Sequence, residues 1–549
     1  MMRPPATAVQ RGLSWFVKWG FAYLLLLAVL TLLGRWWPDY LQGRTWWHFM
    51  ATRMVVAMVM VAAVASLVRL VPAALLTASG LLSIGMASAV KRAATGEPLQ
   101  VSDFFLAGQG THLTGYVSVP QWAVAALFIP ALAYALMRTR LRWWSGPALV
   151  LCVALLSTYR LERVSTWIHD NAWWIGVENL TFSQAESERM NGLATHLYFS
   201  TAGLRLKTHG PDEVAAAMAA LDTAAPPAPR ATPAPDIYVV LGEAWWRDPS
   251  DSFSPLNLLK DMGAVEGTMI SPVYGGTTPN AEFEVLTGVP MRSFPSGIIP
   301  FQHYVSYFSP GLRSLPSLLA GLGYAAHAHH NFTATFWLRN QIYPKMGFAS
   351  FSSRDDMTLV TQANGWPTDQ GLYSHVLERT ATASGPQLNF IVTVETHGPY
   401  AEDRNIDRID GVVHPGITDY HNRLSQAVTS FRNFEAALRA RGRPFVLVAF
   451  GDHLPGLRNH QWTMGYRKET DPRLHSVPLI VSSNSENVSS LRDRLMGRPL
   501  YCLSPVLVDW LGLDVHDRYF AHVVKRCADA ADPALLPAQA VIQNQLFTR

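Results

Sequence analysis

Long uncharged hydrophobic runs are concentrated in the first 160 residues of the chain. A helix needs about 17–25 apolar residues to cross the hydrocarbon layer of a membrane. Five stretches approach that length, and they are residues 19–34, 51–69, 71–90, 119–137 and 143–159. The second and third are separated at Arg69 and Pro72, because one helix over both would far exceed the roughly 30 Å core. The pattern predicts a transmembrane domain of five helices at residues 1–159.

Five spans would place the two ends of the chain on opposite sides of the membrane. Cytoplasmic loops carry an excess of Lys and Arg. With the N-terminus inside, the cytoplasmic side holds Arg3, Arg11, Lys18, Arg69, Arg138, Arg140 and Arg142, and the outer side holds Arg35, Arg44, Arg53, Lys91 and Arg92. This modest bias favours a large C-terminal region outside the cytoplasm. No small-residue cleavage site follows the first apolar run, so we expect a retained helix and not a removed signal peptide.

The pattern changes after residue 159. Residues 160–222 are amphipathic and aromatic, which favours helices that lie along the membrane surface as a connector. Residues 223–235 form a Pro/Ala tract, which predicts a semi-rigid linker. Beyond it, short β-rich runs alternate with helix-like segments, and these runs are DIYVVLGE, GYAAHAHH, LNFIVTVETH, PFVLVAFGDH and SVPLIVSS. Nearly continuous apolar strands are typical of a parallel sheet covered on both faces. We therefore predict an α/β domain with a central, mostly parallel sheet at residues 236–549.

Composition and charge agree with a membrane part followed by a water-soluble part. Hydrophobic residues make up 49% of the chain and charged residues 15%. The net charge of +4 is small for 549 residues and the basic residues form no soluble cluster, so a nucleic-acid partner is not indicated. The three cysteines lack metal-binding spacing, and Cys152 falls in the fifth predicted span. Cys502 and Cys527 are either a disulfide in an oxidising compartment or two unpaired thiols.

Polar residues that can do chemistry follow four of the predicted strands. They are Glu243, His329 with His330, Glu395 with His397, and Asp452 with His453. In open α/β sheets the ligand site lies beyond the carboxyl ends of the strands, so we expect a common site there. Glu243, Asp452 and His453 offer oxygen and nitrogen donors without a thiolate, which suits Mg²⁺, Mn²⁺ or Zn²⁺. The competing interpretation is that Gly451 and Asp452 only form a turn after a buried strand.

The segment YGGTTPNAEFEVLTG, residues 274–288, supplies a candidate nucleophile. A threonine hydroxyl needs a base or a metal to lower its pKa before it can attack. Gly275 and Gly276 would let the backbone approach a phosphate, and AEFEVLTG predicts a helix whose N-terminal amides could hold an anion. Thr278 and Pro279 would be the cap and the first residue of this helix. Capping alone would explain the threonine, and a capping position also exposes its hydroxyl.

These motifs together resemble the lipoteichoic acid synthase and phosphoglycerol transferase family, membrane members of the alkaline phosphatase and sulfatase superfamily. The resemblance rests on GGTTPNAEFEVLTG, FWLRNQIYPKMGF, THGPY and GDHLP, which occur in family order, and on GEPLQVSDF between the third and fourth predicted spans. It covers nearly the whole chain. One departure is Glu243-Ala244-Trp245, where the family often has Glu-Ser-Trp, so a hydroxyl is lost near the metal but the ligand is kept.

The resemblance implies roles for seven residues. The metal ligands would be Glu243, Thr278, Asp452 and His453, with Thr278 also the nucleophile, and the substrate-binding residues would be Trp337, Arg339 and His397. Thr278 is preferred to Thr277 because it stands four residues before Glu282, which is the family's spacing. Arg339 would clamp a phosphate, Trp337 would form an apolar wall and His397 would donate to a phosphoryl oxygen or a leaving hydroxyl. The cofactor would be one divalent ion, with Mn²⁺ or Mg²⁺ favoured and Zn²⁺ possible.

The resemblance also implies a reaction, namely transfer of glycerophosphate from phosphatidylglycerol through a phospho-threonine to a glycan or polyglycerophosphate acceptor. The enzyme would lie in a bacterial cytoplasmic (inner) membrane with its catalytic domain on the periplasmic or extracellular side. A composition rich in Ala, Arg and Trp favours a Gram-negative source and a periplasmic glucan. The alternatives are a phosphoethanolamine transferase, a membrane-bound sulfatase or phosphatase, and a non-enzymatic sensor. A sulfatase would need C/S-x-P-x-R at the nucleophile, and a sensor on a decayed fold would have lost a ligand.

Overall fold

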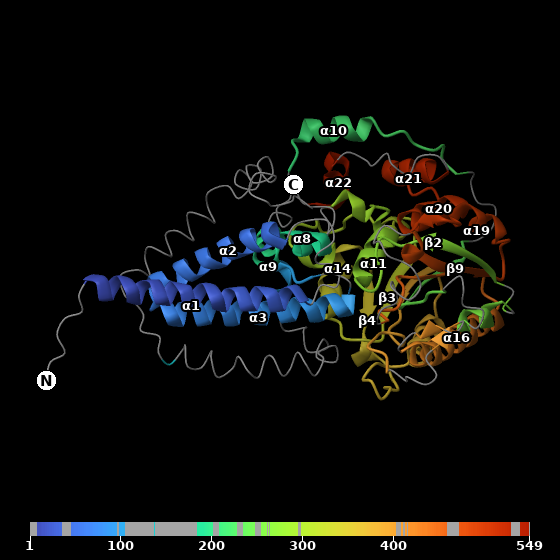
Figure 1. Cartoon of the computed structure of the whole chain (residues 1–549). Helices are drawn as coiled ribbons and strands as arrows, with labels where there is room; N and C mark the ends of the chain where they lie inside the picture. Colours follow the sequence, from blue (N-terminus) through green and yellow to red (C-terminus); the bar gives the residue numbers. More distant parts are fainter. Residues whose placement is uncertain are drawn as a thin grey trace. The chain divides into compact units, whose positions relative to one another are not determined.

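The structure is a computed structural model of the chain, and it contains two compact units. They are residues 1–205 with 295–297, and residues 206–294 with 298–549 (Figure 1). The residues described are 8–35, 46–95, 98–104, 137, 184–200, 208–227, 234–247, 254–260, 262, 264–294, 298–401, 408–409, 412–413, 416–457, 472–528 and 539–547.

The N-terminal unit contains three long apolar helices, α1 (Ala8–Arg35), α2 (Trp46–Leu67) and α3 (Leu70–Thr95). Ala22, Leu26, Val61, Ala74 and Leu82 are among the residues buried between them. Short helices follow at α4 (Val101–Phe104), α8 (Gln184–Asn191) and α9 (Leu193–Ser200). Ion pairs from Lys91 to Asp103 and from Arg92 to Glu188 tie α3 to α4 and α8.

Two helical segments in the described part are long and apolar enough to cross a membrane, Gly12–Leu33 and Leu70–Arg92. A third apolar segment, Arg53–Ala65, is shorter. The first and third predicted spans therefore coincide with candidate spans, and the second falls on an apolar helix below that length. The predicted spans at 119–137 and 143–159 lie outside the described residues except for Met137. The described residues thus show two candidate spans where the sequence predicts five.

The C-terminal unit is built on an eight-stranded sheet in the order β10-β2-β9-β8-β1-β5-β3-β4. Its strands are β1 (Asp236–Gly242), β2 (Val265–Ile270), β3 (Ala325–His330), β4 (Ser350–Ser352), β5 (Gln387–Val392), β8 (Phe445–Gly451), β9 (Ser476–Ser483) and β10 (Arg498–Pro499). A separate two-stranded sheet pairs β6 (Arg408–Ile409) with β7 (Val412–Val413).

All five predicted strands are present, but the sheet is mixed. The predicted strands β8, β1, β5 and β3 run parallel to one another, as expected, and β4 is parallel to β3. The run SVPLIVSS forms β9, which is antiparallel to both β8 and β2. A continuous apolar run shows that a strand is buried and leaves its direction open. Five of the seven strand pairings in this sheet are parallel, as expected of a mostly parallel sheet, and the two pairings of β9 make it mixed.

Helices cover both faces of this sheet. They are α10 (Pro211–Ala219), α11 (Thr278–Thr287), α12 (Pro300–His303), α13 (Leu315–Ala320), α14 (Arg339–Lys345), α15 (Asp369–Thr380), α16 (Ile417–Ala440), α18 (Pro472–His475), α19 (Ser489–Leu495), α20 (Leu503–Trp510), α21 (Arg518–Ala528) and α22 (Gln539–Leu546), with 3₁₀ turns at η3 (Pro255–Leu259), η4 (Met291–Ser293), η5 (Phe336–Leu338), η6 (Arg354–Asp356) and η7 (Leu500–Cys502).

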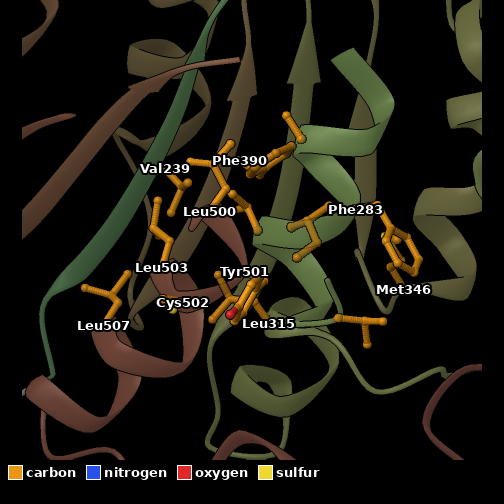
Figure 2. Packing of buried hydrophobic residues seen from close by; sticks show 14 of the residues in the cluster. Val239, Phe283, Leu315, Met346, Phe390, Leu500, Tyr501, Cys502, Leu503 and Leu507 are labelled. Carbon is orange, nitrogen blue, oxygen red and sulfur yellow. The ribbon is translucent and has the colours of Figure 1, made fainter. Parts of the chain in front are cut away.

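Alternate residues of β1 enter two separate cores, as the two-residue period of a strand requires. Val239 and Leu241 pack with residues of α11, α13 and α20, and Figure 2 shows Val239, Phe283, Leu315 and Leu503 in this core. Tyr238 and Val240 pack with residues of α15 and α16 on the other face. The prediction of a sheet buried on both faces is therefore confirmed.

The flanking segments add two details to this unit. The predicted linker carries contacts at both described ends, since the Ala224 amide bonds to the Ala521 carbonyl at 3.0 Å and the Pro235 carbonyl accepts from Tyr324 at 3.2 Å. Its role as a spacer, like the predicted domain limits, stays a prediction. Cys502 and Cys527 are joined in a disulfide, which decides between the two alternatives that the sequence left open.

Candidate active site

The register of the central strands brings two acidic residues together. β1 and β8 are parallel neighbours in which Gly242 lies opposite Gly451. The next residue on each strand is acidic, Glu243 after β1 and Asp452 after β8. Since parallel strands end at the same edge, residues 209 positions apart in the chain become neighbours.

Glu243, Asp452 and His453 form a buried group in which one ligand atom of each residue lies within 4.8 Å of the others. The Nε2 atom of His453 is 3.2 Å from Asp452 Oδ2 and 3.6 Å from Glu243 Oε1. His453 Nδ1 lies 2.8 Å from the Leu454 carbonyl oxygen. A carbonyl only accepts, so Nδ1 donates to it, and Nε2 is the ring atom that faces the two carboxylates and could bind a cation.

The environment of these carboxylates fits a divalent cation. Asp452 Oδ1 accepts the amides of Ala244 and His453 at 2.7 and 2.8 Å, whereas the buried Oδ2 atom has no hydrogen-bond partner. Burial, and then the charge of Asp452, raise the pKa of Glu243 well above its ordinary value, although Arg339 opposes the rise. A buried, partnerless carboxylate oxygen beside a second acid and an imidazole lone pair is the donor set that such a cation requires.

Thr278 joins this group from α11. Its hydroxyl oxygen lies 3.3 Å from Glu243 Oε2 and 3.5 Å from His453 Nε2. The expectation that Thr278 caps the helix is wrong, because Thr277 is the N-cap residue, in a left-handed conformation with φ of 67°. Thr278 is the first helical residue and Pro279 the second. The structure therefore brings together the four residues that the sequence predicted as metal ligands, and the Thr278 hydroxyl lies against Glu243 and His453.

Arg339 is 1% exposed and belongs to a buried network. Its Nε and Nη2 atoms bond the Glu282 carboxylate, which also accepts a 2.6 Å hydrogen bond from Tyr343. Its Nη1 atom lies 3.1 Å from His330 Nε2, and His330 Nδ1 lies 2.9 Å from the Val392 carbonyl oxygen. The Arg339 guanidinium group is thus bound by the Glu282 carboxylate in this structure. Binding of a phosphate by Arg339 stays a prediction.

Trp337 and His397 are both half-buried. Trp337 precedes Arg339 by two residues and packs beside Phe336, with ring centroids 5.4 Å apart. His397 stacks on Trp366 at a centroid distance of 4.1 Å, and its Nδ1 donates to the Gly398 carbonyl at 2.7 Å. Both residues therefore have fixed surroundings, and their contact with substrate stays a prediction.

Unusual backbone conformations gather at these residues. Five non-glycine residues in the described part have positive φ, namely Ala244, Thr277, Trp337, Leu338 and His516. Ala244 follows Glu243, Thr277 precedes Thr278, and Trp337 and Leu338 precede Arg339. Such conformations cost of order 1–3 kcal/mol each and are typical of functional sites.

Comparison with known families agrees with this geometry. A family model described as sulfatase matches residues 235–512, which is more than half of the 549 residues. The chain belongs to the sulfatase family.

Two curated relatives of this sulfatase-family chain are named for a glucan and for lipoteichoic acid. A Rhizobium meliloti protein, named provisionally for cyclic beta-1,2-glucan modification, is 28% identical over 430 residues, which cover 71% of this chain and 65% of that protein. Lipoteichoic acid synthase 2 of Bacillus subtilis is 25% identical over 226 residues, 38% of this chain and 33% of that protein. The chain thus spans less than two thirds of the length of the curated relatives that it matches.

A solved structure shares the fold over most of the chain. The integral membrane protein lipooligosaccharide phosphoethanolamine transferase A from Neisseria meningitidis superposes with a TM-score of 0.53 and 12% identity. The superposition covers 92% of this chain and 96% of that one. At this identity the likeness shows the fold alone.

Sequence reasoning missed several residues that support the site of this sulfatase-family chain. The hydroxyl of Thr393 accepts the Glu243 amide at 2.9 Å, and the hydroxyl of Thr396 donates to the Glu243 carbonyl. Glu282 and Tyr343 hold Arg339. Two signals in the sequence could have found them. The apolar run LNFIVTVETH contains polar residues, and the acid Glu282 lies four residues after Thr278 in the buried helix α11.

Proposed function

We propose that the protein is a phosphoglycerol transferase that moves glycerophosphate from phosphatidylglycerol to an extracytoplasmic glycan or polyglycerophosphate. The observation that carries the proposal is the position of the Thr278 hydroxyl, 3.3 Å from Glu243 Oε2 and 3.5 Å from His453 Nε2. The motifs shared with lipoteichoic acid synthases, and the Bacillus subtilis relative of that name, support the choice of glycerophosphate.

Glu243, Asp452 and His453, with the Thr278 oxygen, would hold the cofactor. Three of these four residues offer oxygen, which favours Mn²⁺ or Mg²⁺, and the histidine also permits Zn²⁺. A divalent cation bound there would lower the pKa of the Thr278 hydroxyl and offset the negative charge of the phosphoryl oxygens.

In the first step the Thr278 oxygen attacks the phosphorus of phosphatidylglycerol. The bond from phosphorus to the Thr278 oxygen forms, and the Thr278 hydroxyl loses its proton to solvent. The bond from phosphorus to the diacylglycerol oxygen breaks, and diacylglycerol leaves with a proton. His397 would supply that proton and Trp337 would pack against the glycerol group. The positive charge of Arg339 lowers the pKa of Glu243 and therefore reaches the cation site. It would stabilise the phosphoryl oxygens, because phosphoryl transfer depends mainly on positioning and charge neutralisation.

In the second step an acceptor hydroxyl attacks the same phosphorus and releases Thr278. The acceptor oxygen forms the new bond, its proton passes to His397, and the Thr278 oxygen takes a proton back from solvent. A glucan acceptor is favoured by the name of the Rhizobium meliloti relative, and it agrees with a periplasmic location.

The location rests on three features. Two apolar helices meet the length of a membrane span, and the charge bias of the N-terminal loops places the C-terminal unit outside. The Cys502–Cys527 disulfide fits an oxidising compartment, since such bonds are rare in the cytosol. We infer a multi-pass inner-membrane protein whose catalytic domain meets its lipid donor at high effective concentration.

A phosphoethanolamine transferase is the second candidate, because the Neisseria meningitidis enzyme of that class shares the fold over 92% of this chain. The nucleophile and cation would be the same, and only the transferred head group would differ. A sulfatase activity is less well supported, since Thr278-Pro279-Asn280 stands where a Cys or Ser would be converted.

The two candidate functions are distinguished by incubating the full-length protein with one labelled lipid donor at a time and measuring which label is transferred. In mixed micelles with Mn²⁺ and a cyclic glucan, we expect diacylglycerol release and label transfer from glycerol-labelled phosphatidylglycerol. Label transfer from ethanolamine-labelled phosphatidylethanolamine alone would overturn the assignment. Thr278→Ala is the inactive control for both donors.

A further inference from the structure

Two fully buried acids, Asp369 and Glu395, lie outside the metal-ligand set. Asp369 begins α15, and Glu395 follows β5 by three residues. Each side chain accepts the backbone amide of the other residue. Glu395 Oε2 lies 2.8 Å from the Asp369 nitrogen, and Asp369 Oδ1 lies 3.2 Å from the Glu395 nitrogen. These reciprocal bonds fasten the start of α15 to the segment after β5.

This segment carries the residues that fix Glu243. Thr393 accepts the Glu243 amide and Thr396 donates to the Glu243 carbonyl, so both sides of the Glu243 peptide are held. Glu395 lies between these two threonines, and His397 follows directly. A shift of the Asp369–Glu395 contact would therefore move a predicted metal ligand and a predicted substrate-binding residue together.

The two acids differ in their hydrogen bonding. Asp369 Oδ1 also accepts the Val394 amide at 3.2 Å and the Asn331 side-chain amide at 2.9 Å, for three donors in all. Glu395 accepts one donor. Several N–H donors favour the ionised form of an acid, so Asp369 is the better carboxylate. Burial raises the pKa of Asp369 to about 6, and burial together with Asp369 raises the pKa of Glu395 to about 8.

The remaining oxygens of both acids are buried without a hydrogen-bond partner, Asp369 Oδ2 and Glu395 Oε1. The charged and titratable groups that face the pair are Tyr373 from α15, Arg423 from α16 and Glu243 after β1. Tyr373 is fully buried, and Arg423 bonds to Asp419 and to the His397 carbonyl. Within the described residues, no cationic side chain bonds either acid, so a proton on one of them is what relieves the repulsion between the two charges.

We propose that Asp369 and Glu395 are a positioning pair, with Asp369 as the carboxylate and Glu395 as the protonated acid, and that the pair sets the segment that holds Glu243 and His397. The inference rests on the proposed function only in assigning Glu243 to the cation and His397 to the substrate. Neither member of the pair contacts substrate, and each acts through its neighbours in the chain.

The pair predicts unequal effects of substitution. Glu395→Gln reproduces the size and donor of the protonated acid, so Mn²⁺ affinity and kcat should stay within about twofold of the parent. Asp369→Ala removes the acceptor of three N–H groups, so Mn²⁺ affinity should fall about 10-fold or more and kcat should fall more than KM changes. Asp369→Asn, which keeps an acceptor oxygen, should restore part of both.

The pair also predicts a pH dependence with a definite sign. Glu395 keeps its proton in the folded chain up to a pH of about 8, whereas the unfolded chain releases it near its ordinary value. Stability from the protonated acid is thus fully present below about pH 4.5 and is lost as the pH rises toward 8. Above pH 8 Glu395 would ionise and place a second negative charge beside Asp369, which would weaken the contact between the two residues. Mn²⁺ affinity should therefore fall above pH 8 in the parent but not in Glu395→Gln, whose side chain cannot ionise.

Glu284 provides the matched control. It is a buried acid outside the metal-ligand set whose pKa is raised to about 8 by burial, and it accepts the amides of Met291 and Tyr501. Glu284→Gln should reduce the pH dependence of the unfolding free energy by about as much as Glu395→Gln does. It should leave the pH dependence of Mn²⁺ affinity as in the parent, since Glu284 does not hold Glu243.

The test is Mn²⁺ titration calorimetry, thermal unfolding and steady-state transfer on the full-length variants between pH 6 and pH 9. Equal losses of Mn²⁺ affinity in Glu395→Gln and Asp369→Ala would overturn the proposed positioning pair. Elemental analysis showing a second divalent ion per chain that Glu395→Gln removes would also overturn it. Absent transfer in the parent, with the predicted Mn²⁺ and stability pattern intact, would refute the proposed function and leave the pair supported.

Discussion

The hydroxyl of Thr396 donates to the backbone carbonyl of Glu243, so the position of a predicted metal ligand depends on a residue that is not itself a predicted ligand. Thr396→Val keeps the shape of the side chain and removes the donor. We expect Mn²⁺ affinity to fall about 10-fold, the lower end of the effect of outer-shell groups, as measured by titration calorimetry. Thr429→Val is the control, because Thr429 is exposed and its hydroxyl bonds to the Ser425 carbonyl within α16. Unchanged affinity in Thr396→Val would show that Glu243 holds its position without this bond.

The contact between Arg339 and Glu282 is a buried ion pair, with both side chains at most 1% exposed. Arg339→Met would leave the Glu282 charge buried and unpaired, and breaking such a pair costs about 3–5 kcal/mol. We expect this loss in the free energy of unfolding in urea, along with loss of transfer activity. Lys525→Met breaks an exposed pair with Asp222 and should change stability far less. Equal effects of the two substitutions would refute the structural role of Arg339.

How far single residues could be predicted depended on how close they are in sequence to a strand end. Glu243, Asp452 and His453 follow apolar strands directly, so the topology of the sheet alone brings them together. Glu282 and Arg339 are 57 residues apart, and no pattern in either segment signals their pairing. The sequence therefore predicted Arg339 as a phosphate clamp, whereas its fork bonds Glu282 in the folded chain.

At the scale of elements, burial was predictable and strand direction was not. The five predicted strands are continuous apolar runs, and all of them lie in the sheet. β9 has the same kind of run but is antiparallel, because side-chain burial is the same for either direction. β2 was missed since VEGTMI is mostly half-buried or exposed and its apolar pattern is correspondingly weak.

The disulfide between η7 and α21 should contribute to the stability of the C-terminal unit. It links residues 25 positions apart, for which loop closure in the unfolded chain predicts about 3–4 kcal/mol. The double variant Cys502→Ala, Cys527→Ala should lose about that much in urea unfolding of the full-length protein. A reducing agent should destabilise the parent and leave the variant unaffected. No difference between parent and variant would show that the bond is absent from the purified protein.

For the whole molecule, the predicted orientation places the C-terminal unit outside the cytoplasm. Ser485 lies in an exposed turn after β9, so Ser485→Cys provides a label site remote from the active site. A membrane-impermeant maleimide should label this variant in intact spheroplasts. Labelling that requires lysis would place the unit inside and contradict both the charge bias and the lipid-donor mechanism. The parent protein is the control for reaction at its own cysteines.

The central claim is that Thr278 forms a covalent bond to the phosphorus of a phosphatidylglycerol head group. It is tested most directly by incubating the full-length protein with glycerol-labelled phosphatidylglycerol and Mn²⁺ without an acceptor, followed by mass analysis of the peptide that contains Thr277 and Thr278. The account predicts a glycerophosphate adduct on Thr278 that is absent from Thr278→Ala. An adduct that persists in Thr278→Ala, or one with the mass of ethanolamine phosphate after incubation with mixed lipids, would contradict it.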